Sequence, residues 1–535
     1  MNKDKIFVLL FFITLFVWCI AISYPFQPDY DLWARLIAGK SVVENGIILK
    51  NDVFSYTPTH IWYDHEWLSG TIFYYLTTIA SKIHKTIIET LGLFKALLTF
   101  FIFAIASICV FIRKPNNSSA FQILYFSIAA LCANVAFAST IRCHMFTFLF
   151  FVFWILILET YRQTNRKFLL AILPITMIAW GNLHGGCLSG LGLLIMYTIG
   201  EYLNKKDIRP YVLTLIVSFF TLFINPYGTG YVKFLFTAGL MDRGWISEWN
   251  SPFLMIKQTS KFIMFFIFMC FIALMCPLTK QGWTKEKTKI ILVIVTGLIA
   301  VLHAKLIPFF VITASIFMFN DVYNVLRQFV FLKWTINHKN LFVYALLLIL
   351  ALNTIDMNVK NRYGVINYAM YPYKAVQFLR ENTLIGHLFT EFSYGSYCIY
   401  KLYPQNKIFM DGRYEEVYNP NLINVMKDFI KQEGENPNAV LTDYKTDIVL
   451  LFRPVNVQLP EQRQKVFKVL EDLKWQKIYK DEFFEIYLHP EYPKKIFTRS
   501  EYEPLKHSLM MFETNITKDI LKRATTNNKI TPFNK

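Results

Sequence analysis

The segment PFQPDYDLWARLIAGKSVVENGIILKNDVFSYTPTHIWYDHEWL, residues 25–68, decides how the rest of the chain is interpreted. It follows a single apolar segment and is rich in acidic, aromatic and turn-forming residues. Asp29 and Asp31 stand near its start, and His65 and Glu66 stand near its end. Loops carried by a rigid scaffold are where functional side chains concentrate, so we expect the functional residues to gather around this segment.

The composition is that of a membrane protein with one extramembrane domain. Of the 535 residues, 54% are hydrophobic and only 17% are charged, whereas about a quarter are charged in an ordinary soluble domain. The net charge is +18, and the Lys and Arg residues are scattered between apolar runs. This distribution is typical of loop residues that set the orientation of a protein in the membrane, and it disfavours nucleic-acid binding. The eight cysteines include no CxxC pair, so neither a thiolate metal site nor a disulfide framework is predicted.

The apolar runs predict a polytopic α-helical membrane protein. A spanning helix needs about 20 mostly apolar residues, and the sequence predicts about 11 spans. The predicted spans are residues 5–24, 87–112, 120–140, 144–160, 168–183, 186–203, 210–225, 261–279, 289–303, 306–323 and 340–356. The first is expected to stay uncleaved, because no small-residue cleavage site follows it. Residues 67–84 can span or lie in the interface, and the positive-inside rule favours the interfacial helix.

This topology places the unusual polar segments on one non-cytoplasmic face. These segments are residues 28–31, 65–67, 142–144, 180–186, 225–228, 248–252 and 303–305. We therefore expect a transmembrane domain at 1–356 with a large first outer loop at 25–86. Convergence of polar groups from many helices on one surface is the arrangement that an active site there requires.

Residues 357–495 are expected to form a small α/β domain on the same face, followed by a polar tail at 496–535. Helices are predicted near 372–382, 420–433 and 460–473. Strands are predicted near 385–390, 397–400, 407–410, 447–452, 475–480 and 483–488. Such a mixture of elements is typical of an α/β domain.

The acids of the first loop are the candidate catalytic residues. Asp29 or Asp31 can act as a general base that removes a proton from an acceptor hydroxyl or amine. Two carboxylates can also hold a divalent cation through oxygen ligands. The alternative is a solvated helix cap, since Asp is common in that position.

A second group of candidates lies at helix ends in the expected transmembrane domain. His65, Glu66 and Trp67 can bind a metal or position a sugar, although an acid before a helix is also favoured by the helix dipole. Asn182 and His184 precede Gly185-Gly186, a pair that permits a close backbone approach or a tight turn. 

Three further candidates are cationic or ionisable groups at the ends of predicted spans, namely Arg142, His144 and Lys305. A lipid-linked phosphate needs such groups for charge-assisted hydrogen bonds. Their alternative role is snorkelling to lipid phosphates. In the C-terminal part, residues 411–413 (Asp-Gly-Arg) follow an apolar run and can form either a ligand site or a simple turn.

Taken together, these motifs resemble the GT-C superfamily of integral membrane glycosyltransferases. The resemblance rests on a first span, a long outer loop with an Asp-x-Asp pattern, and a His-led motif before an interfacial helix. It is nearest to protein mannosyltransferases and lipid A aminoarabinose transferases. A branch of bacterial membrane proteins is also similar in its Trp-x-Asn-x-His-Gly-Gly, Asn-Pro-Tyr-Gly and Asp-Gly-Arg segments, which stand here at 180–186, 225–228 and 411–413.

The resemblance implies an inverting glycosyltransferase that works on the periplasmic face of a bacterial inner membrane. Its partners would be a polyprenyl-phosphate-linked sugar donor, the lipid bilayer and an extracytoplasmic acceptor. It implies a catalytic base at Asp29 or Asp31, interfacial helices at 32–44 and 67–84, and, where a divalent metal is used, ligands among Asp29, Asp31, His65 and Glu66. The substrate-binding residues would be His65, Glu66, Trp67, Arg142, His144, Asn182, His184 and Lys305.

Two other function classes fit parts of the sequence. One is a transporter or flippase for a lipid-linked glycan, which broken helices and charges at the midplane would mark. The other is an assembly protein whose soluble domain docks a partner. Few acids fall inside the predicted spans, which favours the transferase interpretation.

Overall fold

The computed structural model describes residues 9, 12–13, 15–17, 19–20, 28–82, 85–113, 129, 141–241, 243–244, 246–255, 261–275, 286–326, 371–455 and 458–492. The predicted span at 340–356, the boundary at 356 and the tail at 496–535 lie outside these residues. The predicted span at 120–140 lies outside them except for residue 129, and the first span is described in part. The chain forms two compact units. Met1–Pro28 and His65–Gly364 make up a helical unit, and Asp29–Asp64 and Val365–Lys535 make up a second unit.

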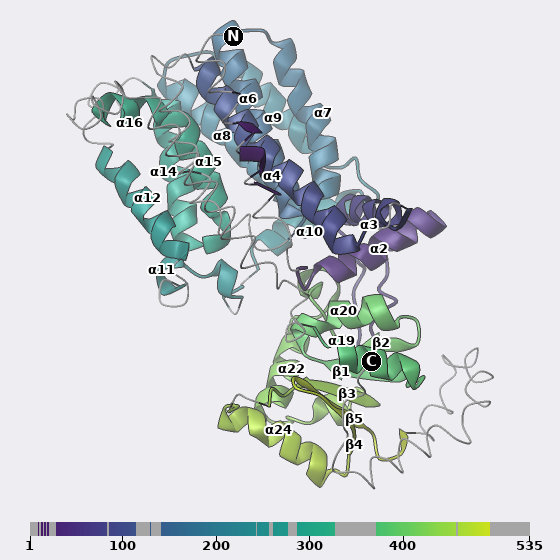
Figure 1. The fold of residues 1–535 in the computed structure, drawn as a ribbon. Helices are drawn as coiled ribbons and strands as arrows, with labels where there is room; N and C mark the ends of the chain where they lie inside the picture. Colours follow the sequence, from purple (N-terminus) through teal and green to yellow (C-terminus); the bar gives the residue numbers. More distant parts are fainter. Residues whose placement is uncertain are drawn as a thin grey trace. The chain divides into compact units, whose positions relative to one another are not determined.

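The helical unit follows the apolar runs of the sequence (Figure 1). Its helices and 3-10 turns, in chain order, are α3 Trp67–Lys82, α4 Ile87–Ile112, α6 His144–Thr164, α7 Phe168–Leu183, η1 Gly185–Cys187, α8 Leu188–Leu203, α9 Arg209–Thr221, α10 Thr229–Gly239, η2 Ser247–Trp249, α11 Pro252–Met255, α12 Lys261–Met275, α14 Lys287–Leu302, η3 Ala304–Leu306, α15 Ile307–Phe317 and α16 Phe319–Leu326. Helix α10 is absent from the sequence prediction.

Several of these helices have the length and apolar composition of membrane-spanning helices, and the protein is a multi-pass membrane protein. Within the described residues, Ile87–Val110, His144–Thr164 and Gly185–Leu203 are long and apolar enough to cross a bilayer. The segments Ala304–Phe317 and Phe319–Val325 are together long and apolar enough to cross a bilayer, but they are bent by 60° relative to each other. The sequence predicts one continuous span there, at 306–323. The shorter apolar helices α7 and α9 pack beside α6 and α8 (Figure 1). The total of about 11 spans stays a prediction.

An ionic network ties the helices together at one end of this unit. Arg113, which follows α4, contacts Glu159 and lies 2.8 Å from Glu286. Arg162 lies 2.9 Å from each of Glu159, Glu201 and Glu286. Burial alone would raise the pKa of the Glu286 carboxyl, but the guanidinium of Arg113 and its hydrogen bonds lower that pKa to about 2. The network therefore links α4, α6, α8 and the start of α14.

The second unit combines the first loop with an α/β domain. Its elements are α2 Leu32–Asn45, α19 Tyr373–Glu381, β1 Gly386–Thr390, α20 Phe392–Leu402, β2 Asn406–Ile408, α21 Tyr414–Val417, α22 Asn421–Lys431, α23 Ala439–Thr442, β3 Ile448–Phe452, α24 Glu461–Asp472, β4 Gln476–Lys480 and β5 Phe484–Leu488. The sheet order is β2-β1-β3-β5-β4. Strands β2, β1 and β3 are parallel, and β5 runs antiparallel to both β3 and β4.

Burial explains where the strands form. The sequence IVLLF of β3 is almost wholly buried at the centre of the sheet, as expected for a strand covered on both faces. The edge strand β4 carries exposed Gln and Lys residues, which protect an edge from pairing with other chains. Most predicted elements of this domain are confirmed. The strand predicted at 397–400 is wrong, because these residues lie in α20, and a short apolar run does not distinguish a strand from a buried helix.

The first loop adds to the sheet of its own unit. The backbone N–H of Tyr56 donates to the carbonyl of Ile408 (3.0 Å), and the N–H of Ile408 donates to the carbonyl of Phe54 (3.0 Å). The ring of Tyr56 stacks on His387 with centroids 4.3 Å apart. Residues 54–56 thus extend the sheet beside β2.

Candidate functional site

The two candidate acids, Asp29 and Asp31, lie in the second unit where the chain enters α2. Asp29 is buried, and its Oδ1 accepts a hydrogen bond from the backbone N–H of Asp31 (3.0 Å). Asp31 is the N-cap residue of α2, but its side chain makes no capping hydrogen bond. The side chain of Asp29 therefore stabilises the turn before α2 from a buried position, and it is not a solvated helix cap.

Gly412 lies directly against the carboxylate of Asp31. A Cβ atom at Gly412 would stand 1.9 Å from Asp31 Oδ1, so the Asp31 carboxylate would have to move away. The glycine of the Asp-Gly-Arg segment thus leaves room for the Asp31 carboxylate in its present position. The segment positions Asp31 within this unit.

Arg413 forms the centre of a buried charged cluster. Its guanidinium lies 2.8 Å from Asp52 Oδ1 and 3.0 Å from Asp411 Oδ1, and it donates to the hydroxyl of Tyr418 (3.2 Å). It also lies 4.8 Å from the ring centroid of Trp62. Burial alone would lower the pKa of Arg413, but the charges of Asp411 and Asp52 hold that pKa well above its ordinary value. The cluster fastens the first loop to β2 and α21.

A second buried cluster fixes α2 to the same loop. Arg35 on α2 donates to Asp64 (2.8 Å) and forms an ion pair with Glu416. The indole N–H of Trp62 donates to Glu416 Oε2 (2.5 Å). Both clusters leave the loop that carries Asp29 and Asp31 firmly held within the second unit.

In the helical unit, His184 sits at the break between α7 and η1. Its backbone is extended, and its Nδ1 accepts the N–H of Gly186 (2.9 Å). Thr147 Oγ1 lies 2.8 Å from the same nitrogen and accepts from the indole N–H of Trp180. Because Nδ1 is an acceptor, the neutral ring carries its proton on Nε2, which lies 3.3 Å from Glu66 Oε1.

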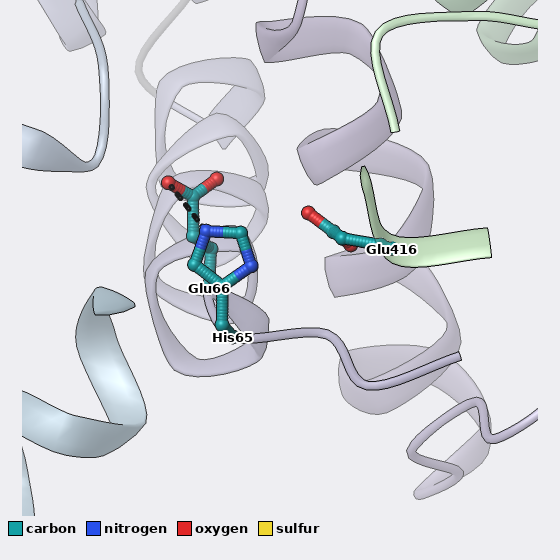
Figure 2. A group of neighbouring side chains, drawn as sticks. All are labelled: His65, Glu66 and Glu416. Atoms are coloured by element: carbon teal, nitrogen blue, oxygen red, sulfur yellow. Dashed lines mark ion pairs between the residues drawn. The ribbon is translucent and has the colours of Figure 1, made fainter. Parts of the chain in front are cut away.

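This hydrogen bonding decides which side chains suit a metal. A metal bound through His184 Nε2 would need the proton on Nδ1, where Gly186 already donates, so His184 does not fit. His65 and Glu66 do fit: His65 Nε2 lies 3.7 Å from Glu66 Oε1 (Figure 2). Two ligand atoms around one tetrahedral zinc ion stand about 3.4 Å apart. These two side chains offer ligand atoms at that spacing.

Trp67 and Asn182 hold helices together. The indole N–H of Trp67 donates to Asn182 Oδ1 (2.9 Å), and the Asn182 amide donates to the carbonyls of Ile178 (2.8 Å) and Ile224 (2.9 Å). The start of α3 is thereby fastened to α7 and to the segment after α9. Ser69 adds a hydrogen bond to the carbonyl of Leu183 (2.5 Å).

Arg142 and Lys305 converge on one carboxylate. Arg142, just before α6, lies 2.5 Å from Glu248 Oε2, and Lys305 in η3 lies 2.9 Å from Glu248 Oε1. Burial alone would raise the pKa of Glu248, but the charges of Lys305 and Arg142 hold it well below its usual range. His144 interacts electrostatically with both cations and with His184. The two cations and two histidines therefore belong to one region of the helical unit.

The structure thus divides the predicted site residues between the units. Asp29 and Asp31 belong to the second unit, and His65, Glu66, Trp67, Arg142, His144, Asn182, His184 and Lys305 belong to the helical unit. Sequence reasoning omitted Glu248, Thr147 and Arg413 from the site residues. Glu248 could have been found from the sequence, because it is an acid in the polar segment 248–252, which is predicted on the same face as the cations Arg142 and Lys305.

No protein-family model matches the chain, and no curated protein sequence matches it. Solved structures do match: the chain has the fold of the GT-C integral membrane glycosyltransferases, which confirms the resemblance seen in the sequence.

Two solved proteins illustrate the match. The apo oligosaccharyltransferase of Archaeoglobus fulgidus aligns with a TM-score of 0.57 at 12% identity, over 82% of this chain and 69% of that one. ArnT from Cupriavidus metallidurans in the apo state aligns with a TM-score of 0.53 at 11% identity, over 91% of this chain and 98% of that one. At such identities the comparison concerns the fold.

Proposed function

We propose that this protein is a glycosyltransferase that moves a sugar from a polyprenyl-phosphate-linked donor to an extracytoplasmic acceptor. The acceptor is a glycan, a lipid or a protein, and the site faces the periplasmic side of a bacterial inner membrane. Asp29 or Asp31 serves as the general base.

The observation that carries this proposal is the convergence of Arg142 and Lys305 on Glu248 in a GT-C fold. Two cations share one carboxylate there, so the single charge of Glu248 balances only one of the two positive charges, and cations bind a phosphate through charge-assisted hydrogen bonds. Solved proteins of the same fold support a lipid-phosphate ligand. The oligosaccharyltransferase AglB was solved with a dolichol-phosphate and an inhibitory peptide, and ArnT was solved with undecaprenyl phosphate.

The reaction is a single displacement at the anomeric carbon. The acceptor oxygen or nitrogen forms a bond to that carbon, the bond from the carbon to the phosphate oxygen breaks, and the configuration inverts. The acceptor proton passes to the carboxylate of Asp29 or Asp31. Arg142 and Lys305 stabilise the negative charge that develops on the leaving phosphate. His144 and His184 shape the site beside them.

A divalent metal is compatible with this site. The A. fulgidus oligosaccharyltransferase was solved in complex with Zn and sulfate. In this chain, His65 and Glu66 of the helical unit would supply ligands. A bound cation would add positive charge near the leaving phosphate. Elemental analysis of the purified protein, wild type beside His65→Ala, measures this directly.

The decisive experiment is sugar transfer by purified protein from a panel of radiolabelled polyprenyl-phosphate sugars. The wild type is compared with Asp29→Asn and Asp31→Asn, which keep the size of each side chain. Loss of a general base lowers the rate by roughly 100- to 10,000-fold. Glu44→Gln is the matched control, because it removes an exposed carboxylate of the same unit.

Loss of turnover in one Asn variant, with normal thermal unfolding, identifies the base. If the wild type consumes no donor, or both variants remain as active as the wild type, the transferase proposal fails. A flippase or an assembly protein for lipid-linked glycans then becomes the leading interpretation. Lipid-linked sugar movement across reconstituted vesicles distinguishes these two.

A further inference from the structure

A half-open hollow in the second unit shares no lining residue with the clusters described above. Its volume is about 410 Å³, and it is lined by side chains of α19 and α20. Tyr373, Gln377 and Arg380 come from α19, and Tyr397 and Lys401 come from α20. Tyr373 is 41% exposed and presents an aromatic ring at the hollow.

Two cations stand at this hollow without an acidic partner among the residues that the structure describes. Arg380 makes no ion pair there, and Lys401 is placed only over aromatic rings, 5.2 Å from the centroid of Tyr400 and 6.0 Å from that of Trp33. Burial and then the charge of Arg380 lower the pKa of the Lys401 ammonium. Two like charges held close together are mutually unfavourable, and an anion between them removes that cost.

The other groups of the hollow indicate the ligand that accompanies the anion. Aromatic rings offer flat apolar faces, and the amide of Gln377 can hydrogen-bond hydroxyl groups. Glu381 also lines the hollow, but its carboxylate accepts a hydrogen bond from Gln377 (2.7 Å). Ligand sites combine apolar and aromatic walls with a few placed polar groups in this way.

We propose that this hollow binds an anionic saccharide, with the negative group between Arg380 and Lys401 and the sugar ring against Tyr373. The ligand class is a sugar acid. The inference goes beyond the transferase proposal and is independent of it, because binding is measured without any sugar donor.

The test is calorimetric titration of the full-length protein in detergent with D-glucuronate, D-glucose and inorganic phosphate at millimolar concentration. We expect D-glucuronate to bind best. Arg380→Gln and Lys401→Gln should each weaken its binding about fivefold, as for a partly exposed charge-assisted contact. Lys374→Gln is the matched control. Lys374 is an exposed lysine on α19, the helix that also carries Arg380, and Lys374 does not line the hollow.

Two further variants test the orientation. Glu381→Gln removes the only acid that lines the hollow within the described residues and should strengthen D-glucuronate binding. Tyr373→Ala should weaken D-glucuronate binding while leaving phosphate binding unchanged. The proposal is overturned if D-glucuronate does not bind, if D-glucose or phosphate binds equally well, or if Lys374→Gln weakens binding as much as Lys401→Gln.

Discussion

Replacing Arg413 by Lys is expected to loosen the second unit. Arg413 donates from three nitrogens to Asp52, Asp411 and Tyr418, whereas a lysine supplies one nitrogen and satisfies one carboxylate. Both acidic side chains are fully buried, so one carboxylate is left without its cation. Breaking such a buried pair costs about 3 kcal/mol, the lower part of its usual range, because the charge is kept.

That cost is measurable in the whole protein. A loss of about 3 kcal/mol lowers the melting temperature of a domain of this size by about 6–12 °C. We would follow thermal unfolding of the purified protein in detergent, together with hydrogen exchange of residues 50–64 and 405–418. Both segments should lose protection, because Asp52 lies in one and Asp411 in the other.

Arg453→Lys is the matched control. Arg453 pairs with Glu485, but its side chain is 36% exposed, so its replacement should cost about 1 kcal/mol or less. If Arg413→Lys melts as the wild type does and leaves exchange in both segments unchanged, the cluster does not fasten the first loop, and our explanation of the Asp-Gly-Arg segment is wrong.

Two further predictions concern other contacts. Gly412→Ala should destabilise the protein by about 1–3 kcal/mol, since the new Cβ overlaps Asp31, and Asp31→Ala in the same chain should restore the melting temperature. Glu248→Gln should cost about 1 kcal/mol at neutral pH, because Arg142 and Lys305 lose a half-buried counterion. The lowered pKa of Glu248 means that its contribution is complete above its unfolded pKa and is lost as the pH falls through the folded one. The melting difference between wild type and Glu248→Gln should therefore stay constant above about pH 5 and shrink in stronger acid; a difference that grows on acidification contradicts it.

Long apolar runs made most helices predictable from the sequence, because a helix that faces lipid must be apolar over its length. Short runs were less informative. Residues 397–400 are four consecutive apolar residues, and such a run does not separate a strand from a buried helix. In the structure every residue from 394 to 399 is buried, so α20 is covered on all sides over this stretch and lacks the one-sided apolar pattern of a surface helix.

The contacts of the candidate site were beyond sequence reasoning. Arg413 and Asp52 are 361 residues apart, and Arg35 and Glu416 are 381 residues apart. In the sequence, the Asp-Gly-Arg segment at 411–413 is compatible with either a ligand site or a simple turn. Only the folded chain shows that the guanidinium of Arg413 is bound by Asp52, Asp411 and Tyr418. The Asp-Gly-Arg segment therefore packs against Asp31 and is not a separate ligand site.

The helical unit differs at its two ends, and this difference bears on where chemistry can occur. At one end, Arg162 near the end of α6 is locked into the ionic network with Glu286 at the start of α14. At the other end, α7 breaks at His184 and α14 breaks at His303, both in extended conformation before a 3-10 turn. Helix breaks release backbone groups from internal hydrogen bonding, and a membrane tolerates this only where protein or a polar cavity satisfies them. The broken end is also where Arg142 and Lys305 meet Glu248, so polar backbone and charged side chains coincide there, while the cations of the other end serve to hold the helices together.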